Sequence, residues 1–112
     1  MSERIQTFEQ FWPYYLGEHR RSGTRILHLS GTTLAVCLGL TAVATGRWWF
    51  LLAGFLAGYA FAWVGHFFVE HNRPATFRHP LWSLAADFKM WALALTGRLP
   101  AELRRVSRGH GP

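Results

Sequence analysis

The chain has 112 residues, of which half are hydrophobic and 16% are aromatic, and it carries a formal net charge of +6. This length leaves no room for a second core, so residues 1–112 are predicted to form one domain. The charge does not indicate nucleic-acid binding. The arginines gather beside apolar stretches, where basic residues orient membrane segments and attract anionic lipid.

The first predicted element is an amphipathic helix within residues 1–22. Its apolar residues recur at helical spacing between polar ones, and they are Ile5, Phe8, Phe11, Trp12, Tyr15 and Leu16. A helix of this kind lies at the membrane interface. Pro13 is expected to bend or break it, and Ser22-Gly23 is expected to interrupt the chain before the next element.

Two apolar stretches on either side of Gly46-Arg47 are predicted to cross the membrane as a helical hairpin. Residues 48–69 carry no formal charge, and their 22 residues match the ~20 needed to cross a bilayer. Residues 26–45 are less apolar but long enough for the first span. A soluble helical bundle is the alternative.

The arginines near the two spans are distributed unevenly. Only Arg47 marks the turn, whereas five arginines lie near the other end of the hairpin: Arg20, Arg21, Arg25, Arg73 and Arg78. Because basic residues stay on the cytoplasmic side, both chain ends are predicted to be cytoplasmic in this multi-pass protein.

Residues 81–96 are predicted to form a third helix, which has a stripe of large apolar residues: Leu84, Phe88, Trp91 and Leu95. Asp87 and Lys89 interrupt it, and its apolar length is short for a crossing, so we expect it to insert only partly. Residues 104–112 are expected to be a solvated tail. The predicted fold class is therefore all-α: an integral membrane helical hairpin with an N-terminal interfacial helix and a short C-terminal helix.

Small residues follow one face of each predicted span, and each face includes a histidine near the end away from the turn. The face of the second span comprises Gly54, Gly58, Ala62, His66 and Glu70. That of the first comprises His28, Thr32, Ala35, Gly39, Ala42 and Gly46. Small residues allow membrane helices to approach closely, so these faces are predicted to pack together.

His28 and His66 are predicted to lie at the same height in the hairpin. They lie 18 residues before Gly46 and 19 residues after Arg47, which places each ~27–29 Å from the turn. His19 can fold back over the same rim, and Glu70 follows His66 by one helical turn. Because polar groups at this depth are costly, two histidines at one level indicate a metal or proton site, and these four residues together would offer the ligands of a metal site.

Nitrogen and oxygen ligands without thiolate suit Fe(II), Zn(II), Mn(II) or Ni(II). A face of two histidines and one carboxylate is typical of non-haem Fe(II) oxygenases. Two alternatives stay open: a histidine near a span end is often an interfacial residue, and Glu70 is also placed to pair with Arg25 or Arg73.

Two stretches of the chain resemble the fungal 2-hydroxy fatty acid dioxygenase family, which is named for the metabolism of phytosphingosine to odd-numbered fatty acids. They are YYLGEHRRSGTRILHLSGT at residues 14–32 and GHFFVEHNRPATFRHPLWSLAADFKM at residues 65–90. The first contains H-x8-H and the second G-H-x3-E-x3-P. The intervening spans match only in hydrophobicity.

The resemblance implies an Fe(II)-dependent enzyme that uses O2 to shorten a 2-hydroxy fatty acid by one carbon. The fungal proteins do this at the endoplasmic reticulum, and a small bacterial-type member would lie in the inner membrane. The histidines implicated in iron binding fall on His19, His28 and His66, which would be the catalytic residues. His71 and His79 fall where the family pattern usually has no histidine, so we expect them outside the ligand set.

The expected partners are a 2-hydroxy fatty acid, O2 and the lipid bilayer, and the sequence is compatible with a homo-oligomer. Arg25 and Arg73 are the arginines best placed to bind the substrate carboxylate, because a guanidinium makes paired hydrogen bonds to it. Asp87 is expected to orient a ligand histidine, with pairing to Lys89 as the alternative. The alternative functions are a non-catalytic membrane lipid-binding or assembly protein, or another metal-dependent lipid-modifying enzyme.

Overall fold

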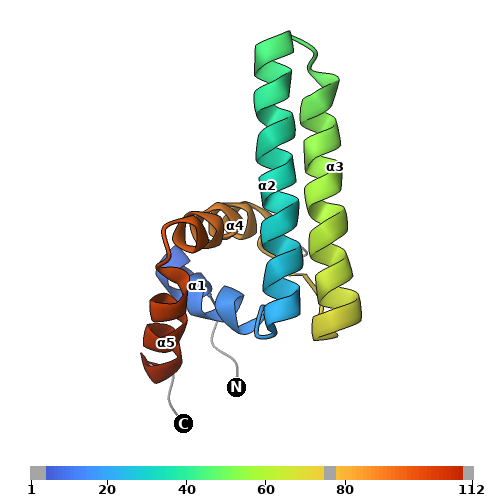
Figure 1. The fold of residues 1–112 in the computed structure, drawn as a ribbon. Helices are drawn as coiled ribbons and strands as arrows, with labels where there is room; N and C mark the ends of the chain where they lie inside the picture. The colour runs from blue at the N-terminus through green and yellow to red at the C-terminus, as the bar shows by residue number, and fades with distance from the viewer. Residues whose placement is uncertain (1–4, 75–77, 110–112) are drawn as a thin grey trace. The chain divides into compact units, whose positions relative to one another are not determined.

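The computed structural model describes residues 5–74 and 78–109, and all the regular secondary structure in these residues is helical (Figure 1). The elements are α1 (Phe8–Gly17), α2 (Ser22–Thr45), α3 (Trp49–Val64), the π-helix η1 (Gly65–Glu70), α4 (Pro80–Leu95) and α5 (Leu99–Gly109). The predicted all-α class is therefore confirmed. The chain divides into two compact units, one of residues 19–74 and one of residues 1–18 and 75–112. We call them the α2–α3 unit and the α1–α4–α5 unit.

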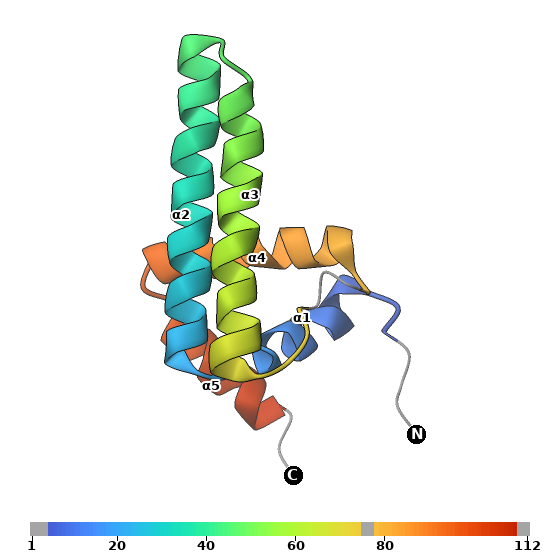
Figure 2. The same cartoon turned by 90° about the vertical axis from the view of Figure 1, so that its right-hand side faces the viewer.

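In the α2–α3 unit, α2 and α3 lie side by side and antiparallel (Figures 1 and 2). Gly46 ends α2 with φ of 71°, a left-handed conformation that glycine adopts without a steric penalty, and its N–H donates to the carbonyl oxygen of Ala42. The tight turn predicted at Gly46-Arg47 is thus present. α2 begins at Ser22, four residues before the predicted start of the first span.

The expected break at Ser22-Gly23 was wrong, because these residues form the first turn of α2. Contacts from η1 hold this turn in helical form. Glu70 Oε1 accepts a hydrogen bond from the N–H of Arg21, and Thr24 is fully buried against Gly65. The low helix propensity of a Ser-Gly pair is a weak local preference, which tertiary contacts override.

Glycines bring the backbones of α2 and α3 close together. A Cβ added to Gly31 would lie 2.7 Å from Cβ of Phe61, and one added to Gly54 would lie 3.1 Å from the carbonyl oxygen of Ala35. The predicted packing of small-residue faces is therefore observed. The predicted face of α2 omitted Gly31, although this residue makes the closest approach.

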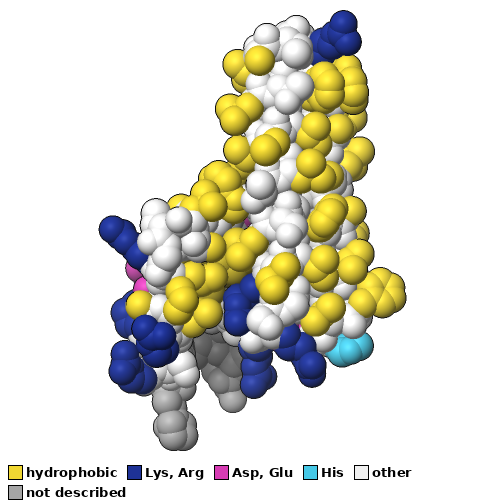
Figure 3. Space-filling model, viewed as in Figure 1, with side chains coloured by type: hydrophobic (Ala, Val, Ile, Leu, Met, Phe, Trp, Pro, Cys, Tyr) yellow, Lys and Arg dark blue, Asp and Glu magenta, His cyan; other side chains and the backbone are white. Residues whose placement is uncertain are grey.

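Both long helical segments of this unit expose apolar side chains. Ser22–Thr45 and Trp49–Glu70 are long and apolar enough to cross a membrane, and only 22% of the apolar window of each is buried. Hydrophobic side chains cover the visible sides of α2 and α3 (Figure 3). Leu40, Val43 and Leu56 are more than 60% exposed. The core helix of a soluble protein would bury most of such a surface.

The α1–α4–α5 unit begins with α1, which is shorter than the predicted helix. The side chain of Thr7 caps it by accepting a hydrogen bond from the N–H of Gln10. The helix continues through Pro13, so the predicted break is absent. Proline removes one backbone hydrogen bond, and the burial of the aromatic residues Phe11 and Tyr15 on either side offsets this loss.

α4 begins and ends within one residue of the predicted 81–96, with Pro80 at its first position. Its most buried residues lie outside the apolar stripe seen in the sequence. The fully buried residues are Ala86 and Met90, whereas Phe88 and Leu95 of the predicted stripe are exposed. Polar contacts decide which face points inward, since the hydroxyl of Tyr15 donates to Asp87 Oδ1 at 2.6 Å. Burial and the neighbouring carboxylate raise the pKa of Tyr15 well above its ordinary value.

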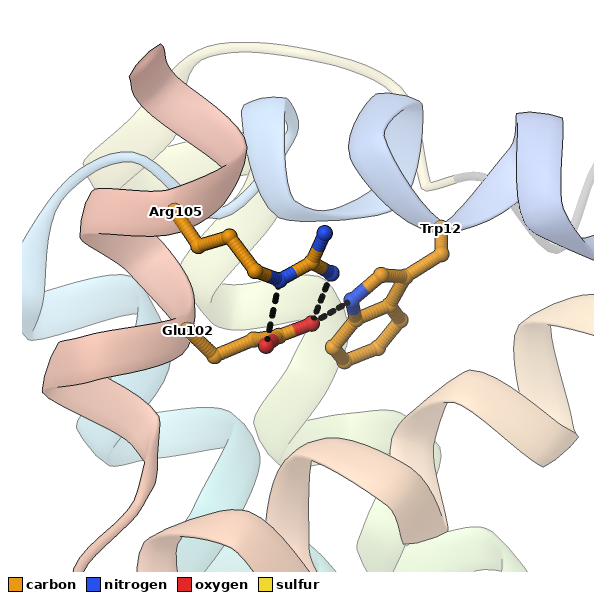
Figure 4. A network of polar contacts seen from close by, with 3 residues as sticks. All are labelled: Trp12, Glu102 and Arg105. Atoms are coloured by element: carbon orange, nitrogen blue, oxygen red, sulfur yellow. Dashed lines mark hydrogen bonds and ion pairs between the residues drawn. The ribbon is translucent and has the colours of Figure 1, made fainter. Parts of the chain in front are cut away.

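The predicted solvated tail at 104–112 was wrong as far as Gly109, because α5 extends to that residue; residues 110–112 lie outside the described residues. Glu102 fastens α5 to α1 (Figure 4). Its Oε2 accepts a hydrogen bond from Trp12 Nε1 at 2.7 Å, and Arg105 donates to both carboxylate oxygens, at 3.0 and 2.6 Å. The tail is helical because these contacts give its polar residues partners within the unit.

We expect the attachment of α5 to weaken in acid. The hydrogen bonds from Arg105 and Trp12 lower the pKa of Glu102 from 4.5 to about 2. A lowered pKa means that the ionised carboxylate stabilises the fold above pH 4.5, and this contribution is lost as the pH falls towards 2. The melting temperature of the wild type should exceed that of Glu102→Gln at pH 6, and the difference should shrink towards pH 2. A difference independent of pH would show that the charge of Glu102 does not stabilise the unit.

Candidate metal centre

Three histidines from separate segments of the α2–α3 unit converge on one point. His19 lies in the turn before α2, His28 lies in α2, and His66 is the second residue of η1. One ring nitrogen from each lies within 4.8 Å of those of the other two. The ring centroid of His19 lies 4.7 Å from that of His28 and 4.5 Å from that of His66. The predicted convergence at one end of the hairpin is thus present.

The three imidazoles are buried, with 1%, 6% and 2% of His19, His28 and His66 exposed. Within the described part of the chain, His19 Nε2 and His28 Nδ1 are buried nitrogens that make no hydrogen bond, although both rings have other contacts. Buried polar atoms are normally hydrogen-bonded, so nitrogens in this state call for an explanation such as a bound ion. The donor set fits a transition metal, which binds imidazole nitrogen at ~2.0–2.1 Å.

Glu70, the predicted fourth ligand, is not part of this converging group. Its Oε1 accepts hydrogen bonds from the N–H of Arg21 at 2.9 Å and from Thr24 Oγ1 at 2.8 Å. The carboxylate thus connects the end of η1 to the start of α2. It lies beside the segment that carries two of the histidines.

Arg25, a predicted substrate ligand, contacts the turn that carries His19. Its Nη1 donates to the carbonyl oxygens of His19 and Arg20, each at 2.8 Å. This use of the guanidinium was not indicated by the sequence, and the contact with substrate stays a prediction. Arg73, the second predicted substrate ligand, is exposed just beyond η1.

Asp87, His71 and His79 are not members of the converging group. Asp87 belongs to the α1–α4–α5 unit, where it accepts the hydrogen bond from Tyr15, and its predicted action on a ligand histidine stays a prediction. His71 is exposed at the end of η1, and His79 stacks on Trp82 with ring centroids 5.5 Å apart. Neither histidine is in the converging group, and their place outside the ligand set stays a prediction.

Sequence reasoning missed Asn72. Its side-chain oxygen lies 2.7 Å from His66 Nδ1, and its backbone N–H donates to the carbonyl oxygen of His66. The residue lies six positions beyond His66, outside the spacing at which helical side chains meet. A helical pattern therefore gave no signal that it would contact the histidine.

The geometry agrees with the comparison to known families. The model of the family described as 2-hydroxy-palmitic acid dioxygenase Mpo1-like matches residues 5–99. The chain belongs to this family. The match confirms the resemblance seen in the two motifs and extends it across both long helices. No curated protein and no solved structure matches the chain.

Proposed function

We propose that this Mpo1-like chain is an Fe(II)-dependent membrane dioxygenase that shortens a 2-hydroxy fatty acid by one carbon. The observation that carries the proposal is the convergence of three buried histidines at the two motifs by which the chain resembles its family. A lipid-binding or assembly protein has no need for three imidazoles at one buried point. A metal-dependent hydrolase would use the same donors but would not need O2.

His19, His28 and His66 would hold the iron. With only three protein ligands, such a site would leave positions open for a substrate and for O2, as oxygenase sites require. When bound, the iron supplies O2 activation. The protein surrounds the ligands with buried helix faces, which keep bulk water away from the ligand nitrogens.

The substrate would reach the site from the lipid. Its carboxylate and 2-hydroxyl form a chelating pair, and the guanidinium of Arg73, which is exposed just beyond η1, would hold the carboxylate. The acyl chain would lie along Phe67 and Phe68, which directly follow His66 in η1 and are 42% and 74% exposed. Because Arg73 would bind only substrate, Arg73→Ala should raise KM and leave the metal content unchanged.

The proposed reaction balances without a further reductant. A 2-hydroxy acid R–CH(OH)–COOH and one O2 give R–COOH, CO2 and H2O. The bond between C1 and C2 breaks, C2 is oxidised to the new carboxyl carbon, and O2 is reduced by four electrons that come from the substrate alone. One O2 should therefore be consumed for each shortened acid.

α2 and the continuous α3–η1 segment would cross the bilayer, with the metal centre at the cytoplasmic face. The lone Arg47 at the turn and the five arginines near the opposite end support this orientation. Labelling of single cysteines introduced into a Cys37→Ser chain tests it. Labelling of the 46–47 turn from the cytoplasm would reverse the proposed topology.

The function is tested by supplying the purified protein with Fe(II), O2 and 2-hydroxypalmitic acid. We expect the acid that is one carbon shorter, together with an equal amount of CO2. Palmitic acid, which lacks the 2-hydroxyl, and an anaerobic reaction serve as controls and should give no product. Absence of the shorter acid from iron-loaded protein would contradict the proposal, and turnover by the Zn(II) form without O2 would favour the hydrolase.

A further inference from the structure

The helix that carries His66 ends in an unusual way. α3 passes into the π-helix η1, and the chain then turns at His71, a non-glycine residue with φ of 63°. The carbonyl oxygen of His66 accepts hydrogen bonds from the N–H groups of both His71 and Asn72, the latter at 2.8 Å. Single-turn π-helices and positive φ at non-glycine residues are uncommon, and both occur often at functional sites.

This turn returns the Asn72 side chain to the ring of His66. Asn72 Oδ1 lies 2.7 Å from His66 Nδ1. In an uninterrupted α-helix, residue 72 would lie ~9 Å farther along the axis than residue 66, beyond the reach of an asparagine side chain. The π-helix and the left-handed His71 are therefore what allow the contact.

The contact determines which nitrogen of His66 carries the proton. A neutral imidazole has one N–H nitrogen and one nitrogen with a lone pair, and an amide oxygen only accepts hydrogen bonds. With Asn72 Oδ1 facing it, Nδ1 must be the donor, so the lone pair lies on Nε2. Metal-binding histidines commonly donate their other N–H to an oxygen in this way, which fixes both tautomer and ring orientation.

We propose that Asn72 is a positioning residue, which holds His66 as the Nδ1–H tautomer and directs Nε2 at the metal. The inference rests on the proposed function, because it takes the three histidines to be the ligands. It goes beyond that function because it states that Asn72, at the end of η1, fixes the tautomer and orientation of His66 before the metal binds.

The test compares three variants of the full chain in detergent, using Co(II) as the probe and a competing chelator to measure affinity. Asn72→Leu keeps a similar size without an acceptor, and it should bind Co(II) ~10–100-fold more weakly. Asn72→Asp keeps an acceptor oxygen and should bind at least as tightly as the wild type. His71→Asn, a matched control in the same turn with a residue that tolerates positive φ, should leave the affinity unchanged.

A second measurement does not depend on metal. In 15N spectra of metal-free protein, His66 should be the Nδ1–H tautomer in the wild type and should lose this preference in Asn72→Leu. Wild-type affinity and tautomer in Asn72→Leu would overturn the inference, as would equal weakening in the Leu and Asp variants. Failure of the wild type to bind Co(II) would instead contradict the proposed function, while the tautomer measurement would still decide the role of Asn72.

Discussion

Replacement of His19, His28 or His66 with alanine is expected to remove the bound metal and to abolish formation of the shortened acid. Each histidine would supply one of only three protein nitrogens, and all three are buried at one point. The loss in activity should exceed the ~10–100-fold that follows removal of an outer partner of a metal ligand. Metal content per chain, measured by elemental analysis after loading with Fe(II), should fall from one ion to nearly none.

The matched control for these variants is His71→Asn, because His71 is exposed and outside the converging group. It should keep wild-type iron content. The helical content of the alanine variants should match that of the wild type, since close approaches at Gly31 and Gly54 pack α2 against α3 away from these imidazoles along the chain. Two alanine variants that retain a full complement of iron would show that the three histidines are not a ligand set.

The convergence of the three histidines could be predicted from the sequence because the relevant distances lie along helices of regular rise. The positions of His28 and His66 relative to Gly46-Arg47 are enough to place them at one height, and both belong to the small-residue faces that were expected to pack together. The prediction for His19 required only that the short segment before α2 turns back towards His28. Regular periodicity thus predicts which residues meet when each lies on, or next to, an uninterrupted helix.

The contacts around the ligands follow no such periodicity. The π-helix at Gly65–Glu70 changes the direction of the residues after His66, and a pattern with a 3.6-residue period does not indicate where it occurs. The contact of Asn72 with His66 and the packing of Thr24 on Gly65 are consequences of this one irregular turn. α5 was missed for a related reason, because its partner Trp12 lies 90 residues from Glu102 in the sequence.

Removal of the Glu70 carboxylate is expected to weaken the metal centre through the fold rather than by loss of a ligand. Glu70 Oε1 accepts hydrogen bonds from the Arg21 N–H and Thr24 Oγ1, and Thr24 is fully buried. These bonds hold η1, which carries His66, against the first turn of α2. That turn lies between His19 and His28 in the sequence. The separation of the three imidazoles therefore depends on this carboxylate.

The two roles of Glu70 give opposite results for two substitutions. Glu70→Leu leaves the Arg21 N–H and the Thr24 hydroxyl without this acceptor, which should cost ~1–3 kcal/mol of unfolding free energy and lower metal affinity. Glu70→Gln retains an acceptor oxygen, so it should keep most of the unfolding free energy and most of the metal affinity. Thr24→Val removes one of the two hydrogen bonds at nearly constant volume, so its losses should lie between those of Glu70→Gln and Glu70→Leu.

The measurements are the unfolding free energy of the metal-free chain and the affinity for Co(II), made on the same preparations. If Glu70 braces the turn, the two quantities should fall together across the Leu, Val and Gln variants. If Glu70 is instead the fourth ligand that the sequence predicted, Glu70→Gln should lose Co(II) affinity as severely as Glu70→Leu, and Thr24→Val should have little effect on it. A loss of Co(II) affinity in Glu70→Gln without a matching loss of stability is expected only if the carboxylate is a ligand. The Gln variant therefore decides between the two roles.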